Sequence, residues 1–213
     1  MLTRRALLGQ CTLLAAAAAV PGIRAATPQR VLVLGDSLSA EYGLQRGQGW
    51  VALLDQRLAR DKINASVVNA SISGDTTSGG RSRLPALLKQ HQPTVVILEL
   101  GGNDALRGLP LAMTRDNLAS MARAAKQAGA KVLVVGMQVP PNYGRQYGDD
   151  FAALFAQVAR SEGTALVPFL LKGVADSPKA DAMFQPDRIH PVAQAHPTML
   201  DNVWAGLKPL LQG

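Results

Sequence analysis

Short, continuously apolar runs alternate along the chain with longer stretches in which apolar residues recur about every 3.6 positions. The short runs predict buried β-strands over Arg30–Leu34, Ser66–Asn69, Thr94–Leu100, Lys131–Met137 and Ala165–Pro168. The periodic stretches predict amphipathic helices over Trp50–Ala59, Leu84–Lys89, Thr114–Ala128, Phe151–Arg160 and Pro197–Leu211. At the helix ends we expect Pro85 and Pro197 in first turns, Thr114 and Asp149 as N-caps, and Gly129 and Gly163 as stops.

Strands that are apolar on both faces and alternate with helices are typical of a parallel sheet covered on both sides. Five such strands predict an α/β protein with a flavodoxin-like, three-layer α/β/α fold. In a doubly wound sheet of this kind, ligands bind beyond the carboxyl ends of the strands. We therefore expect the functional residues among the polar groups that directly follow each strand.

The first 26 residues have the layout of a cleavable signal peptide. A basic start, "MLTRR", precedes the mostly apolar run Ala6–Val20, and "PGIRAA" offers a helix breaker and small residues for cleavage near Ala25 or Ala26. The apolar run is short and contains polar residues, which disfavours a membrane span. Thr3-Arg4-Arg5 resembles a twin-arginine signal, and an ordinary export signal fits equally well. Residues 27–213 then form one domain in the periplasm or outside the cell.

Removal of this segment lowers the formal net charge from +7 to +4, because three arginines leave with it. The remaining surface is mildly basic and has no basic run, so we expect no nucleic-acid partner. The single cysteine, Cys11, also leaves, so the mature chain has neither disulfides nor thiolate metal ligands. We expect a monomer without a stable membrane anchor.

The residues after four of the strands suit acyl-transfer chemistry. A serine becomes a nucleophile when a base takes its proton and a third group orients that base, and Ser37, His190 and Asp187 can fill these roles. The backbone N–H groups of Ser37 and Gly74 and the Asn103 amide could stabilise an oxyanion. Each piece alone is more often a turn or a surface pair, but together, each after a different strand, they favour catalysis. The other two histidines, His91 and His196, are interpreted as solvated or capping residues.

Four motifs make the chain resemble the SGNH, or GDSL-type, serine hydrolases: "GDSLS", "NASISGDT", "LGGND" and "DRIHP". It is most similar to the bacterial periplasmic branch of thioesterase I, lysophospholipase and arylesterase. The resemblance implies strand order 2-1-3-4-5 and neither a metal nor an organic cofactor. It also implies Ser37 as nucleophile, His190 as base, Asp187 as the orienting acid, and Ser37, Gly74 and Asn103 as oxyanion donors. Glu41 departs from the family pattern, which prefers a small residue there, and Arg188 replaces a glycine.

These observations predict an exported serine hydrolase that cleaves small acyl esters and thioesters through an acyl-enzyme. A carbohydrate O-acetylesterase is a second enzymatic interpretation, because the same fold supports it. A non-catalytic ligand-binding module on this scaffold is an interpretation from a different class.

Overall fold

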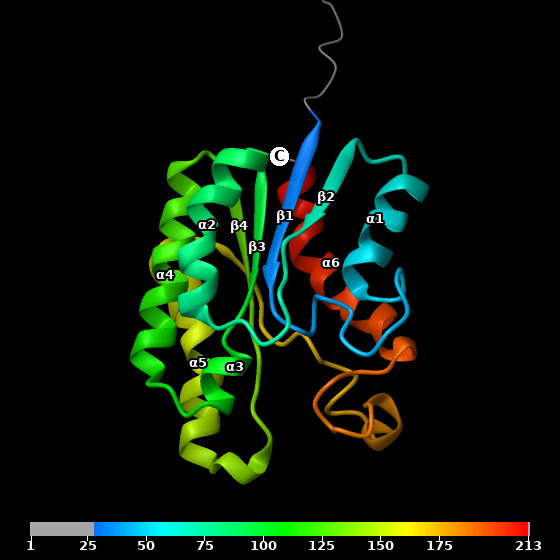
Figure 1. The fold of residues 1–213 in the computed structure, drawn as a ribbon, viewed down its shortest axis with the longest axis vertical. Coiled ribbons are helices and arrows are strands. Elements are labelled where there is room, and N and C mark those ends of the chain that lie inside the picture. The colour runs from blue at the N-terminus through cyan, green and yellow to red at the C-terminus, as the bar shows by residue number, and fades with distance from the viewer. Residues whose placement is uncertain (1–27, 213) are drawn as a thin grey trace, which may run out of the picture.

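The computed structural model describes residues 28–212, in which strands and helices alternate (Figure 1). The strands are β1 (Gln29–Gly35), β2 (Ala65–Asn69), β3 (Val95–Glu99), β4 (Lys131–Val135) and β5 (Ala165–Val167). The helices are α1 (Trp50–Arg60), α2 (Thr77–His91), α3 (Gly102–Leu106), α4 (Leu111–Gln127), α5 (Arg145–Glu162) and α6 (His196–Gln212). Short 3₁₀ turns are η1 (Pro141–Tyr143), η2 (Ala180–Met183) and η3 (Ala193–Ala195).

The five strands form one parallel sheet in the order β2-β1-β3-β4-β5, as predicted. In a strand, successive side chains point to opposite faces, so each buried strand contributes to two cores. In β1, Leu32 and Leu34 pack with α2, α4 and α5, whereas Val31 and Val33 pack with α1 and α6. Figure 1 shows these two groups of helices on opposite sides of the sheet. The three-layer prediction is confirmed.

Three predicted helix boundaries were wrong, because these helices begin before the first residue of their apolar periodicity. Helix α2 begins at Thr77, where the Thr76 side chain accepts the Gly79 N–H, so Pro85 lies inside the helix on an exposed face. Helix α4 begins at Leu111 after Pro110, which places Thr114 inside it. Helix α5 begins at Arg145, so Asp149 is not its N-cap either.

Other helix ends agree with the sequence. Gly163 ends α5 in the left-handed conformation, with φ 62°. Gly129 follows the last turn of α4, with φ 86°, and Pro197 is the second residue of α6. The short helix α3 had no sequence prediction, because five residues are too few to show a periodic pattern.

The predicted signal peptide, residues 1–26, lies outside the described residues. Within residues 28–212, none of the helices has both the length and the apolar character to cross a bilayer.

Candidate active site

Ser37, His190 and Asp187 meet beyond the carboxyl end of β1. Ser37 is the second residue after β1, and the other two lie in the connection between β5 and α6, which passes the lower end of the sheet in Figure 1. His190 Nε2 is 2.8 Å from Ser37 Oγ, although the residues are 153 positions apart in the sequence. His190 Nδ1 is 2.7 Å from Asp187 Oδ2. The three residues therefore have the spacing expected of a nucleophile, a base and an orienting acid.

The turn between Asp187 and His190 holds the carboxylate beside the imidazole. Asp187 Oδ1 accepts the N–H groups of Ile189, at 2.9 Å, and His190, at 3.0 Å. Partial burial acts to raise the pKa of Asp187, but these two N–H groups and the His190 ring outweigh it and lower the pKa to about 2. Asp187 is therefore ionised at any pH near neutrality.

A second set of contacts ties this turn to the loop after β1. Gln185 Nε2 donates to the carbonyl oxygens of Tyr42, at 2.9 Å, and Pro191, at 3.1 Å. The Gln185 N–H donates to the His190 carbonyl at 2.8 Å. The Tyr42 ring also lies against the His190 ring, with centroids 4.2 Å apart. His190 is therefore held in place both by the turn that carries Asp187 and by the loop that carries Ser37.

Gly35, the first residue of the "GDSLS" motif, is needed for the close approach of neighbouring side chains to the backbone. Its backbone is extended, and a Cβ built there would lie 2.6 Å from Glu99 Oε2 and 2.8 Å from Ser39 Oγ. The turn that follows is closed by the N–H groups of Ser39 and Ala40, which both donate to the Asp36 carbonyl. Tight packing behind the strand end therefore sets the position of Ser37.

The three predicted oxyanion donors lie at the same edge of the sheet. The loop before Gly74 runs beside β1, where the Ile72 N–H donates to the Gly35 carbonyl at 3.1 Å. Gly74 has φ 79°, a conformation that glycine adopts without strain. Among the hydrogen bonds of residues 28–212, none uses the backbone N–H of Ser37 or of Gly74, so both donors are free for a ligand.

Asn103 is the second residue of α3, and its Nδ2 donates to Asp36 Oδ2 at 3.1 Å. The next residue, Asp104, is buried and accepts the N–H of Thr77 at 2.9 Å, the Thr77 hydroxyl, and the Thr114 hydroxyl at 3.2 Å. This carboxylate joins α3 to the first turns of α2 and α4. The Gly74 loop is held from the same side, because Arg107 Nη2 donates to the Gly74 carbonyl at 2.8 Å.

The two departures from the family pattern share a backbone feature. Glu41 and Arg188 have φ 59° and 58°, in the left-handed region that favours glycine. Glu41 Oε1 accepts the N–H groups of Gly47, at 2.9 Å, and Gly49, at 2.8 Å, which ties the loop together at the start of α1. Glycine adopts this conformation without strain, whereas a residue with a Cβ does not.

Four large apolar side chains of the described residues are exposed, each between 46% and 50%: Tyr42, Ile72, Leu106 and Ile189. Tyr42, Ile72 and Ile189 lie on the loops that carry Ser37, Gly74 and His190, and Leu106 ends α3, which carries Asn103. Each segment that carries a candidate site residue therefore also exposes a large apolar side chain, which suits the binding of an apolar group.

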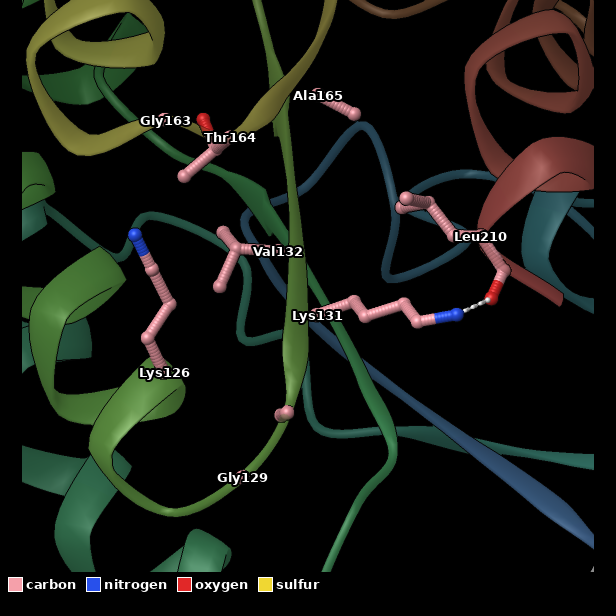
Figure 2. Close-up of a pocket in the computed structure, with 9 residues that line it drawn as sticks. Lys126, Gly129, Lys131, Val132, Gly163, Thr164, Ala165 and Leu210 are labelled. Atoms are coloured by element: carbon pink, nitrogen blue, oxygen red, sulfur yellow. Dashed lines mark hydrogen bonds between the residues drawn. The ribbon is translucent and has the colours of Figure 1, made fainter. Parts of the chain in front are cut away.

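A shallow pocket of about 320 Å³ lies at the amino ends of β4 and β5, far from Ser37 along the strands (Figure 2). Lys131 Nζ donates to the Leu210 carbonyl in the last turn of α6 at 2.9 Å. Lys126 Nζ donates to the Glu162 carbonyl at the end of α5. Both lysines therefore cap helix C-termini. Within residues 28–212, no group of three or more His, Cys, Asp or Glu side chains could hold a metal ion.

Sequence reasoning missed Tyr42, Asp36, Glu99 and Asp104 as parts of the site. The available signal was an acid within or beside an apolar run, since Glu99 ends "VVILE" and Asp36 follows "VLVLG". His196 was interpreted as solvated or capping, and the capping alternative is confirmed. Its Nδ1 accepts the Trp50 N–H at the first turn of α1, although the side chain is buried. His91 ends α2 and is half-buried.

Comparison with known proteins shows one family. Residues 33–197 match the model of the GDSL-like Lipase/Acylhydrolase family. Esterase TesA of Pseudomonas aeruginosa is 54% identical over 186 residues, which cover 87% of this chain and 91% of that protein. Thioesterase 1/protease 1/lysophospholipase L1 of Escherichia coli is 43% identical over 188 residues and 88% of each chain.

A solved esterase structure has a similar fold. The psychrotrophic esterase EstA from Pseudoalteromonas sp., inhibited by monoethylphosphonate, superposes with a TM-score of 0.81 at 36% identity. The superposition covers 87% of this chain and 100% of that one.

Proposed function

The chain belongs to the GDSL-like lipase/acylhydrolase family, and we propose that it hydrolyses small carboxylic esters and thioesters through an acyl-enzyme on Ser37. The observation that carries this proposal is the hydrogen-bonded series from Ser37 Oγ to His190 to Asp187, at 2.8 and 2.7 Å. This arrangement supplies a nucleophile, a base and a group that orients the base.

In the acylation step, Ser37 Oγ attacks the acyl carbon while His190 Nε2 takes the hydroxyl proton. The bond from the acyl carbon to the leaving oxygen or sulfur then breaks, and His190 returns the proton to the leaving group. In deacylation, water attacks the ester on Ser37, its proton passes through His190, and the serine hydroxyl is restored. Asp187 stays ionised and stabilises the imidazolium that forms in both steps.

The negative oxygen of each tetrahedral intermediate needs fixed donors. We assign this role to the free N–H groups of Ser37 and Gly74 and to the Asn103 side-chain amide. Such preorganised donors contribute most when they need no rearrangement during the reaction. The hydrogen bonds of Asp104 and Arg107 support that rigidity.

The exposed apolar residues Tyr42, Ile72, Leu106 and Ile189 favour substrates with an apolar acyl or aryl group over acetylated carbohydrates. A panel of p-nitrophenyl esters of increasing acyl length tests this preference. We expect kcat/KM to rise from acetate to longer chains. A maximum at acetate would favour the O-acetylesterase interpretation.

The first test of the function uses a fluorophosphonate probe on the purified protein. The native chain and Ser82→Ala, a change on an exposed face of α2, should be labelled and hydrolyse esters. Ser37→Ala should stay unlabelled and lose on the order of 10⁶-fold in kcat, as expected for a lost nucleophile. A native chain that is neither labelled nor active would instead indicate a ligand-binding module.

We also propose that the enzyme is exported and acts as a monomer. The layout of residues 1–26 supports export, and all of the site residues come from a single chain. The intact mass of the enzyme from the periplasm or medium should correspond to cleavage after Ala25 or Ala26. Light scattering should then give the mass of one chain, and the mass of two chains would contradict the monomer.

A further inference from the structure

Two acids that the catalytic steps do not use are buried directly behind Ser37. Asp36 follows β1 and is 2% exposed, and Glu99 ends the neighbouring strand β3 and is fully buried. Burying carboxyl groups is costly unless hydrogen bonds compensate. Asp36 contacts Asn103, a proposed oxyanion donor, and Glu99 contacts Asp36, which indicates a role in the site.

The Asp36 carboxylate holds two parts of the site at once. Its Oδ1 accepts the N–H of Leu38, the residue after Ser37, at 3.0 Å. Its Oδ2 accepts an N–H of Asn103 Nδ2 at 3.1 Å, although Asn103 lies 67 positions further along the chain. One side chain thus joins the serine turn after β1 to helix α3 after β3.

The second contact fixes the direction of the Asn103 amide. A side-chain amide is planar and carries two N–H donors on one nitrogen. Once Asp36 takes one N–H, the other is fixed in direction and the amide can no longer turn over. We infer that Asp36 is a positioning residue that directs the second Asn103 N–H towards the oxyanion of the substrate. This inference rests on the function proposed above.

An ionised carboxylate suits this task better than an amide. Asp36 needs an acceptor towards Leu38 and another towards Asn103, and both carboxylate oxygens accept. In Asp36→Asn one of these atoms becomes an N–H donor. The new amide then faces a donor on one side, although the side chain keeps its size.

Glu99 is hydrogen-bonded to the backbone of Asp36 and to the serine turn. Glu99 Oε2 accepts the Ser39 hydroxyl at 2.5 Å and the Asp36 N–H at 3.4 Å, and Trp50 Nε1 donates to that same hydroxyl at 3.2 Å. Burial, together with the charge of Asp36, raises the pKa of Glu99 well above its usual range. Of the two acids, Glu99 therefore favours its neutral form and Asp36 carries the negative charge more readily.

The position of Asp36 makes its contact with Asn103 sensitive to pH. Burial raises the pKa of Asp36 to about 7, aided by the charges of Asp75 and Asp104 and opposed by the Leu38 and Asn103 hydrogen bonds. The facing groups are Glu99 on β3, Asp104 on α3, and Asp75, which is paired with Arg83 at 2.6 Å. As the pH falls through 7, Asp36 takes up a proton and loses acceptor strength towards Asn103.

A double-mutant cycle tests the inference. With p-nitrophenyl butyrate, Asn103→Ala should lower kcat by about 10²–10³-fold, the usual cost of one oxyanion donor. Asp36→Asn should lower kcat by roughly 10–10²-fold with KM nearly unchanged, since only transition-state binding is affected. Asp36→Asn in the Asn103→Ala background should then cost less than about threefold, because a residue that acts through Asn103 loses its effect with it.

Two outcomes of the cycle overturn the inference. One is a wild-type kcat for Asp36→Asn. The other is a full multiplication of the two effects in the double variant, which would mean that Asp36 acts independently of Asn103. Circular dichroism melting curves identify any variant that does not fold.

A measurement on the native chain keeps the test independent of folding and of catalysis. The side-chain amide protons of Asn103, assigned by their absence in Asn103→Ala, should shift in ¹H–¹⁵N NMR spectra with a midpoint near pH 7. Amide signals that stay constant between pH 5.5 and 8.5 would overturn the contact. If the native chain hydrolyses no ester but the amide shift is seen, the proposed function fails while the Asp36–Asn103 coupling stands.

Discussion

The Tyr42 ring lies against the His190 imidazole, with ring centroids 4.2 Å apart and planes tilted by 34°. The Tyr42 carbonyl also accepts the Gln185 amide, so one residue contacts the histidine turn through both its ring and its backbone. An aromatic face attracts a cation. The imidazole becomes a cation when it takes the serine proton, so this contact should favour the reacting state.

We expect Tyr42→Ala to lower kcat by about 2–30-fold, the range that corresponds to a cation–π contact of roughly 0.5–2 kcal/mol. Tyr42→Phe keeps the ring and should stay within about twofold of the native enzyme. Steady-state kinetics on a soluble ester measures both. If Phe is as damaging as Ala, the hydroxyl and not the ring is responsible.

Asp187→Asn should lower kcat by roughly 10⁴-fold while the fold is retained. An amide at this position can donate to His190 Nδ1 and thereby stabilise the tautomer that has no free base at Nε2. The matched control is Asp181→Asn, an exposed acid in the same connection, which should keep native activity. Because the pKa of Asp187 is about 2, no step in the native pH–rate profile between pH 4 and 9 should belong to it. Native-like activity of Asp187→Asn would contradict the assignment of Asp187 as the orienting acid.

His196 should make the stability of the native chain depend on pH. Burial lowers the pKa of His196, and the Pro191 backbone and the Glu41 carboxylate oppose the shift only in part. The unfolded chain then binds the proton more readily than the folded one, so stability is full above about pH 6.5 and falls below it. In His196→Asn, the Oδ1 atom can still accept the Trp50 N–H but does not titrate. The melting temperature should therefore drop more between pH 7.5 and 5.5 in the native chain than in this variant, and equal drops would contradict the prediction.

Arg188→Gly should raise the melting temperature by up to a few degrees. The left-handed conformation at φ 58° costs a residue with a Cβ about 1–2 kcal/mol, and the greater freedom of glycine in the unfolded chain offsets part of that gain. Arg188→Ala removes the charge but keeps the Cβ, so it should gain nothing. Equal melting temperatures for the two variants would show that backbone strain is not the cause.

Much of the fold could be predicted from periodicity alone. The five strands were located to within two residues at each end, because a strand buried on both faces is a continuous apolar run. Helix α2 was the poorest prediction, since its first turns, "TSGGRSR", contain no apolar residue and depend on the Thr76 cap. Such a cap is a contact between a side chain and the backbone, and apolar periodicity does not report it.

The sequence by itself determined which residues could perform chemistry. Ser37, Gly74, Asn103, Asp187 and His190 were chosen because polar residues at the carboxyl ends of parallel strands gather at one edge of the sheet. Tertiary structure alone decided how these residues are held. The Asp36–Asn103 hydrogen bond, the Tyr42–His190 contact and the buried Glu99 join segments 60 or more positions apart. Because hydrogen bonds and ring contacts depend on distances of a few ångströms between such segments, they exist only once the sheet has brought the strand ends together.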